Sequence, residues 1–190
     1  MSLAGWHDLD DDARRETLHR CCGCRRWVEL VSAAAPFADA AAFHAAAEAA
    51  FDRLDRDDWL ESFAHHPRIG DVASLRERSS PHAATADIST REQAGAAGAS
   101  DEVLRALADG NARYHQRFGH VFLVCATGKT AEQMLALLAE RIDNPPDTEL
   151  ALAAGEQRKI THIRIDGLLR GEAGAHSAGL TRRGAERVKK

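Results

Sequence analysis

The sequence predicts an all-α fold, a single compact domain of about seven or eight helices. Three observations support this prediction. Apolar residues recur three and four positions apart through most of the chain, which is the spacing of one helix face. Residues that commonly cap helix N-termini precede several of these stretches. A single run is rich in β-forming residues, Val121–Ala126, and it has no obvious strand partner elsewhere.

Length and charge narrow the class of protein. A chain of 190 residues can bury a sizeable core, and we expect the domain to occupy residues 1–170. Residues 171–190 are glycine-rich and basic, which predicts a loosely ordered tail. The net charge of -4 argues against a nucleic-acid partner. The chain has neither an apolar run of membrane-spanning length nor a signal-like start at Met1–Trp6, so we expect a cytoplasmic protein.

Three of the four cysteines crowd into Cys21-Cys22-Gly23-Cys24. Cys21 and Cys24 form a C-x-x-C pair, but no second pair at zinc-binding spacing accompanies it. The sequence therefore favours free thiols in a reducing compartment, with a thiol-redox role as the alternative. Cys125 lies in the apolar run and is predicted to be a small core residue.

Helical patterns fill the N-terminal third of the chain. Acidic residues at 10–12 suit the start of a helix over 13–22, and Gly23 can end it in a left-handed turn. A second short helix is expected around residues 27–31. Asp39 can cap the next helix, and Asp57 can start another that runs into His66-Pro67. The apolar stripe of the Asp39-capped helix is Phe43, Ala47, Ala50 and Leu54.

The middle of the chain is less regular. Residues 72–88 lack a clean period and are predicted to form a short helix and a loop. Ser89-Thr90-Arg91-Glu92 has the pattern of a capping box, in which the serine and the glutamate satisfy each other's backbone amides. Ser100 can cap a longer helix that reaches Phe118.

The last part begins with the β-rich run 121–126, which we interpret as a buried extended segment or the lead-in to a helix. Its backbone groups need partners, and a bound polar ligand could supply some of them. Thr130 and Gln133 form a second capping box. Pro145-Pro146 end that helix, and Asp147 or Thr148 starts the last long one.

Two familiar kinds of site do not fit the sequence. Gly128-Lys129-Thr130 matches the end of a phosphate-binding loop, but that motif needs a glycine where Leu123 stands. The histidines form no H-x-x-x-H pair and no H-E-x-x-H motif, and the side chains of adjacent His65 and His66 diverge in an extended segment. We therefore predict neither nucleotide chemistry nor a metal site.

The corner at His66-Pro67 admits two interpretations. Proline restricts the backbone of the residue before it, so the imidazole of His66 is held in a narrow range, as a catalytic side chain requires. The alternative is a helix end with a surface histidine, because Pro67 and the nearby Gly70 are common helix and turn signals.

Arg164 is the other residue that calls for an explanation. At about 100° per residue, it falls on the same side of the last helix as Leu150, Ala153 and Ile160. A guanidinium on an apolar face needs an anion. Glu92 could provide it in a salt bridge, or a substrate carboxylate could bind the guanidinium fork. Glu92 could in addition orient a histidine while it caps its helix.

Five blocks carry a resemblance to a known family. They are Cys21-Cys22-Gly23-x-Arg25-Arg26-Trp27, His66-Pro67-Arg68-Ile69-Gly70, Ser89-x-x-Glu92-Gln93-Ala94-Gly95, Phe118–Ala126 and Glu156-x-x-Lys159-Ile160-x-x-x-Arg164. In this order, along residues 6–169, they resemble 2-oxo-4-hydroxy-4-carboxy-5-ureidoimidazoline (OHCU) decarboxylase. Cys24 departs from the family pattern, in which serine is expected.

The resemblance implies a helical, usually homodimeric enzyme that works without a cofactor and converts OHCU to (S)-allantoin in urate breakdown. It implies that His66 is the catalytic acid, supported by Glu92. It also implies a substrate-binding set of Pro67, Ser89, Gln93, Phe122, Leu123, Val124, Cys125, Ala126 and Arg164. The alternative is a non-enzymatic helical domain that keeps the pocket and binds a ligand.

Overall fold

The computed structural model describes residues 1–67 and 99–171. Within these ranges the chain forms eight α-helices and no strand, which confirms the predicted all-α class. The helices are α1 (Leu3–His7), α2 (Asp11–Cys22), α3 (Arg25–Ala33), α4 (Ala40–Phe51), α5 (Arg56–Ala64), α8 (Asp101–Phe118), α9 (Ala131–Arg141) and α10 (Pro146–Leu169).

Side-chain caps determine where several helices begin. The side chains of Asp39 and Ser100 each accept a hydrogen bond from the backbone amide three residues later, as predicted. Thr130 and Gln133 form the predicted capping box at the start of α9. At the other end of α2, Gly23 adopts a left-handed conformation with φ of 79°, which confirms the expected turn.

The predicted start of α5 was wrong by one residue. The helix begins at Arg56 rather than at Asp57, and Asp55 caps it. Asp55 accepts hydrogen bonds from the amides of Asp57 and Asp58, and Asp58 reaches back to the amide of Asp55. Four aspartates lie within seven residues here, so several of them satisfy the sequence preference for an N-cap.

The boundaries of two other helices also differ from the prediction. α10 starts at Pro146 instead of Asp147 or Thr148. Proline suits the first helical position because its missing N–H would have no intrahelical partner there. α4 ends at Phe51, so Leu54 lies beyond the helix whose stripe it was expected to complete.

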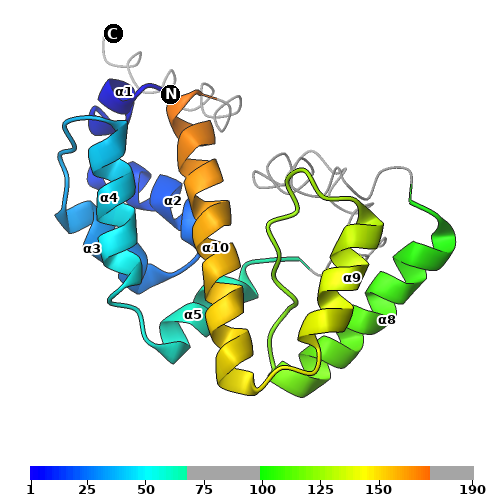
Figure 1. Ribbon diagram of the computed structural model, residues 1–190. Helices are drawn as coiled ribbons and strands as arrows, with labels where there is room; N and C mark the ends of the chain where they lie inside the picture. The colour runs from blue at the N-terminus through cyan, green and yellow to red at the C-terminus, as the bar shows by residue number, and fades with distance from the viewer. Residues whose placement is uncertain (68–98, 172–190) are drawn as a thin grey trace, which may run out of the picture.

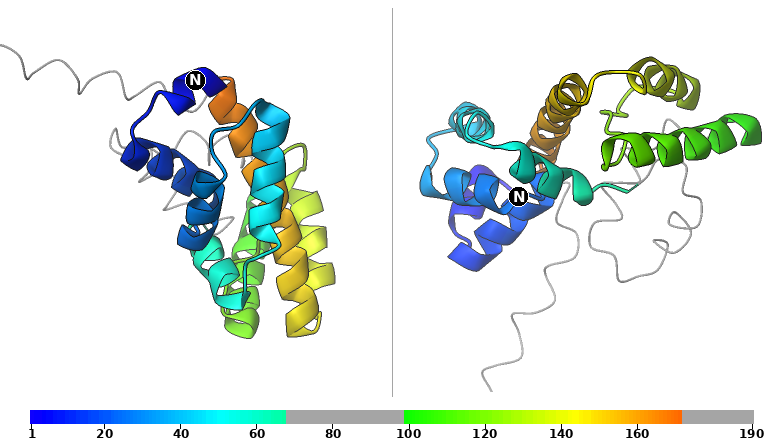
Figure 2. Two further views of the ribbon diagram at one scale, coloured as in Figure 1. Left: turned by 90° about the vertical axis from the view of Figure 1, so that its left-hand side faces the viewer. Right: turned by 90° about the horizontal axis from the view of Figure 1, so that it is seen from below.

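Helix α10 lies at the centre of the arrangement. It packs against α2, α4 and α5, while α8 and α9 pair with each other. Figure 1 shows α10 between the N-terminal helices on one side and the α8–α9 pair on the other, and the view from below in Figure 2 agrees. Side chains of α10 can therefore reach both halves of the structure.

Two apolar clusters meet at residues 121–126. The larger cluster includes Trp6, Trp27, Phe43, Phe63 and Ile165, and the smaller one lies between α8 and α9. Along the segment, Leu123 and Cys125 join the larger cluster, whereas Phe122, Val124 and Ala126 join the smaller one. This alternation has the period of an extended chain. Together with the absence of helix over 121–126, it confirms the buried extended segment.

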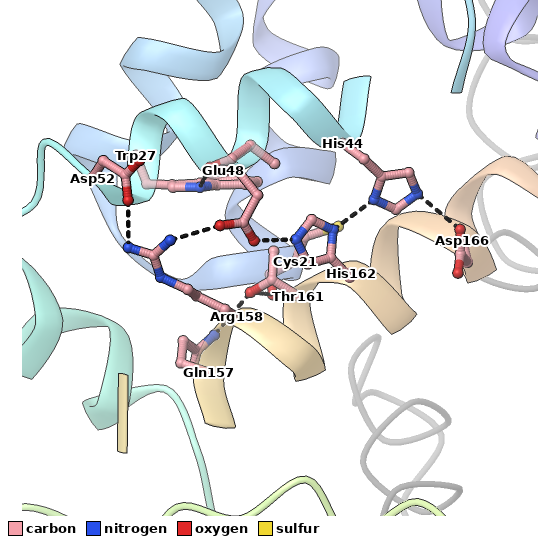
Figure 3. A network of polar contacts seen from close by, with 11 residues as sticks. Cys21, Trp27, His44, Glu48, Asp52, Gln157, Arg158, Thr161, His162 and Asp166 are labelled. Atoms are coloured by element: carbon pink, nitrogen blue, oxygen red, sulfur yellow. Dashed lines mark hydrogen bonds and ion pairs between the residues drawn. The ribbon is translucent and has the colours of Figure 1, made fainter. Parts of the chain in front are cut away.

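A polar network ties α4 to α10, away from the residues just described (Figure 3). Arg158 donates to Glu48 at 2.6 Å and to Asp52 at 2.8 Å. His162 also contacts Glu48, and its Nδ1 lies 2.6 Å from Nδ1 of His44. One of these two nitrogens must carry a proton, because two lone pairs cannot face each other at that distance. These contacts fix α4 against α10.

The four cysteines are buried free thiols, as predicted. Burial raises the pKa of Cys22 to about 12, and it also raises the pKa of Cys24. Such thiols are poor nucleophiles, which argues against the redox alternative.

Among the residues that the structure describes, no helix combines the length and apolarity needed to cross a bilayer. The predicted loop over 72–88 and the Ser89–Glu92 capping box lie outside the described residues, as does the tail beyond Gly171.

Candidate active site

His66 and Pro67 form one wall of a cavity, and the extended segment 122–126 forms another. All seven of these residues were predicted as site residues from the sequence. Thr127, Ile160 and Ile163 complete the described lining and were not predicted to be site residues. Ile160 had been placed on the inward face of α10, and Ile163 follows it at a spacing that puts both on one side of the helix.

The end of α5 fixes the position of His66. The helix closes at Ala64, and the amide of His66 donates to the carbonyl of Phe63 at 3.1 Å. Pro67 follows and restricts the backbone of His66. Phe63 is fully buried in the larger cluster. The His66 ring is therefore positioned by a packed helix end rather than by a free loop.

The C-terminal end of α2 lies beside this corner. Its last carbonyl groups have no partner within the helix, and side chains from α5 and α10 supply donors. Ser62 donates to the carbonyl of Cys22 at 2.6 Å, and Gln157 donates to the same oxygen at 3.4 Å. Thr161 donates to the carbonyl of Cys21 at 3.3 Å. The Cys21-Cys22-Gly23 block is thus joined directly to α10.

Arg164 belongs to the same junction. It is buried, as its predicted inward orientation requires. Its Nη1 donates to the carbonyls of Arg20 at 3.4 Å and Cys21 at 3.3 Å. A cation is favourable at the negative end of a helix dipole. The two predicted anionic partners, Glu92 and a substrate carboxylate, stay predictions, because Glu92 lies outside the described residues.

Gly23 makes room for the residue next to His66. A Cβ atom added to Gly23 would lie 2.7 Å from the ring of His65, closer than packed atoms approach. The His65 ring also meets the ring of His19 edge-on, with 4.6 Å between centroids. The glycine of the Cys21-Cys22-Gly23 block therefore serves both the left-handed turn and the close packing of the His65-His66 corner.

The His66 imidazole is electrically neutral in this environment. Burial lowers its pKa to about 3, with a further lowering by the positive charge of Arg164, while a hydrogen bond that the ring donates to the side chain of Gln157 acts in the opposite direction. Its Nε2 atom is buried and has no well-aligned partner in the described part of the chain. The prediction that His66 donates a proton therefore requires a partner that favours the protonated ring.

Side chains from α9, α10 and the turn before α9 satisfy the backbone of the extended segment. Glu156 accepts from the amide of Cys125 at 2.7 Å, and Lys129 donates to the carbonyl of Cys125 at 2.8 Å. Arg141 donates to the carbonyl of Leu123 at 2.8 Å. Protein side chains therefore bind these three backbone groups. From the sequence, a bound ligand was a possible partner for them.

Arg141 is itself held by a buried ion pair with Glu149. The Nε atom of Arg141 lies 2.9 Å from Oε1 of Glu149, and the Glu149 side chain is completely buried. Tyr114 and Asn144 also donate to this carboxylate, and the Arg141 guanidinium lies 4.8 Å from the centroid of the Phe122 ring. The pocket segment is thus anchored to the ends of α9 and α10.

Three predicted site residues, Ser89, Glu92 and Gln93, lie outside the described residues. Gln157 is a further residue beside His66 that was not predicted from the sequence. It is completely buried beside His66. Its place on the same face of the last helix as Arg164 was the available signal, because the two residues are seven positions apart.

The fold and the cavity together define an all-α protein with a candidate small-molecule site beside a buried histidine. Comparison with known proteins identifies its family. The model of the OHCU decarboxylase family matches residues 7–166. The chain therefore belongs to the OHCU decarboxylase family.

Individual relatives agree with this assignment. The uric acid degradation bifunctional protein TTL of Arabidopsis thaliana is 38% identical over 146 residues, which are 76% of this chain and 44% of that protein. A crystal structure of OHCU decarboxylase in the presence of (S)-allantoin has a TM-score of 0.68 and 33% identity, covering 82% of this chain and 98% of the other.

An (S)-allantoin synthase structure has a TM-score of 0.62 at 17% identity, with 88% of this chain and 54% of the other covered. At that identity it supports the fold alone. The chain spans no more than half the length of the curated relatives that it matches.

Proposed function

We propose that this chain is a carboxy-lyase that decarboxylates OHCU to (S)-allantoin in urate catabolism without a cofactor. The observation that carries the proposal is the position of His66, fixed at a packed helix end opposite segment 122–126. This arrangement occurs in a chain that matches the OHCU decarboxylase family over residues 7–166. The relative crystallised in the presence of (S)-allantoin supports the choice of product.

The reaction requires the protein to position the substrate and to deliver one proton. The bond to the substrate carboxylate breaks, CO2 leaves, and the electron pair that remains on carbon is accepted by the adjacent ring imine. A proton must then reach that carbon from one face to give one enantiomer. A positioned imidazole can deliver it, because both protonation states of histidine are accessible near neutral pH once its surroundings allow.

The substrate itself supplies part of what His66 needs. In the free protein, burial and Arg164 keep the pKa of His66 at about 3. A bound carboxylate beside the ring favours the imidazolium, since an opposite charge within a few ångströms stabilises the charged form. The protonated ring therefore forms together with the substrate complex, and the charge of Arg164 is offset at the same moment.

The remaining roles follow the family resemblance. Glu92 orients His66 as the second catalytic residue, and Arg164 binds a substrate carboxylate or carbonyl. The other substrate-binding residues are Pro67, Ser89, Gln93 and the segment Phe122–Ala126. We further propose that the chain works as a homodimer in the cytoplasm, where its four buried thiols stay reduced.

Freshly prepared OHCU tests the proposal. The purified protein should accelerate OHCU decay and give optically active (S)-allantoin, followed by circular dichroism. His66→Asn should abolish both effects, whereas His115→Asn, on α8 and outside the cavity lining, should leave them unchanged. Unaltered stereospecific turnover in His66→Asn would refute the role of His66. Allantoin binding without any turnover by the unmodified chain would instead establish the ligand-binding alternative.

Size-exclusion chromatography with light scattering tests the dimer. A mass of twice 20.6 kDa is expected, and a monomer at working concentration would contradict it.

A further inference from the structure

Gln157 has a polar side-chain amide at a buried position, where most polar side chains would be unfavourable. Its side chain is completely inaccessible to solvent, on the face of α10 that packs against α2. Its amide nitrogen donates to the carbonyl of Cys22 at 3.4 Å and to the hydroxyl oxygen of Thr161 at 3.1 Å. Figure 3 shows Gln157 and Thr161 one turn apart on α10.

These contacts fix which way the amide points. The carbonyl of Cys22 can only accept, and the Thr161 hydroxyl already uses its proton on the carbonyl of Cys21. Both groups therefore require the nitrogen of Gln157 on their side. A flipped amide would place three oxygens together in a buried site, so Oε1 must face the other way.

Nε2 of His66 lies on that side, and as an N–H group it would need an acceptor. Oε1 of Gln157 is buried without a well-aligned donor, and Nε2 of His66 is buried without a well-aligned partner. The two side chains are close enough to interact through a hydrogen bond. Leaving both atoms unsatisfied costs free energy that a hydrogen bond between them would recover.

We propose that Gln157 is a positioning residue for His66: its Oε1 accepts a hydrogen bond from Nε2–H of His66 and so makes Nδ1 the nitrogen that exchanges the proton with substrate. This inference rests on the proposed decarboxylase function for its catalytic meaning. The tautomer that it predicts is a property of the free protein and does not depend on turnover.

The proton balance of the step follows from this tautomer. The neutral ring carries its proton on Nε2 and takes a second one from solvent on Nδ1 as the anionic substrate binds. After CO2 leaves, the Nδ1 proton passes to the substrate carbon, and the ring returns to the neutral Nε2–H form. Throughout, the Gln157 oxygen stabilises the positive charge of the imidazolium through Nε2–H, against the effects of burial and of Arg164.

The first test uses the unmodified chain with 15N-labelled histidine. Nitrogen chemical shifts distinguish the two tautomers, and the His66 signal is assigned by its loss in His66→Asn. We expect His66 to carry its proton on Nε2 at neutral pH. A ring protonated on Nδ1 would overturn the proposal, even if the chain proves to be an active decarboxylase.

The second test changes the charge at position 157. Gln157→Glu places a carboxylate against Nε2, and an opposite charge at this range should raise the pKa of His66 by about one to three pH units. Ala151→Glu adds the same charge at an exposed position of α10 and should leave the His66 titration unchanged. Equal titrations in the two variants, each with native circular dichroism, would contradict the proposal.

The third test applies the proposal to catalysis. Gln157→Leu should lower kcat while KM stays close to the original value, because substrate contacts are retained and only the proton-donating form is lost. In Gln157→Glu the pH profile of kcat should move to higher pH together with the His66 titration. A pH profile that does not follow the titration would remove Gln157 from the catalytic step.

Discussion

Replacing Glu149 by glutamine should destabilise the protein strongly, because it leaves the charge of Arg141 buried without its counter-ion. The Glu149 side chain is completely buried, and Arg141 is 10% exposed. Four donor groups meet the Glu149 carboxylate, from Arg141 (twice), Tyr114 and Asn144. Removing one partner of a buried ion pair costs about 3–5 kcal/mol. Small domains are stable by only about 5–15 kcal/mol.

Urea unfolding followed by circular dichroism measures this cost. Glu149→Gln should lower the unfolding midpoint sharply at an unchanged m-value. Asp147→Asn is the matched control. Asp147 lies one half-turn earlier on α10 and pairs with Arg56 at 3.5 Å, but its side chain is 98% exposed. Such pairs contribute little, so the control should unfold with the original midpoint.

The double variant Arg141→Met/Glu149→Leu separates a missing counter-ion from a missing contact. Removing both charges should recover much of the stability lost in Glu149→Gln, since apolar side chains can replace a buried pair at little cost. A Glu149→Gln cost below about 1 kcal/mol, or a double variant weaker than the single one, would refute the reasoning for a buried site.

Three further outcomes are expected. Gly23→Ala should destabilise the protein more than Gly119→Ala. Both glycines have a left-handed backbone, which costs an alanine about 1–2 kcal/mol. Only Gly23 also faces a ring, that of His65, and overpacking against it adds about 1–3 kcal/mol. Equal midpoints would contradict this. Glu156→Ala removes the acceptor of a pocket amide and should lower OHCU turnover with helix content retained; full turnover would show that this anchor is dispensable. Finally, the pKa of His66 is lowered from 6.5 to about 3, so the unfolded chain binds a proton that the native ring does not. Stability should fall below pH 6.5, by up to about 1.4 kcal/mol per pH unit from this group, and His66→Asn should flatten that slope in denaturant titrations.

Local patterns predicted most of the helices because their signals lie within a few residues of one another. The caps at Asp39 and Ser100 were found from single side chains, and the cap at Thr130 from its capping box with Gln133. The start of α5 was missed because several neighbouring aspartates could each act as its N-cap. Only the folded backbone decides between them. Helix starts are thus predictable where a single capping residue is present.

The lining of the candidate site was predictable only where its residues are neighbours in the sequence. His66, Pro67 and the segment 122–126 are contiguous blocks, and each lines the cavity. Gln157 could not be found in this way. Its significance depends on the end of α2 meeting α10, a contact between residues 135 positions apart in the sequence. Periodicity could place Arg164 on the inner face of its helix, but it could not identify the carbonyl oxygens that the guanidinium meets.

The junction between α2 and α10 therefore links stability to the chemistry of the site. Gln157, Thr161 and Arg164 recur four and three residues apart on α10, and each binds a carbonyl at the end of α2. The same stripe surrounds His66: Arg164 lowers its pKa, and Gln157 opposes that effect. The carbonyls at the end of α2 need hydrogen-bond donors. Two of these donors, Arg164 and Gln157, also act on the His66 imidazole. Substitutions in this stripe should alter folding and the protonation of His66 together, because the same side chains determine both.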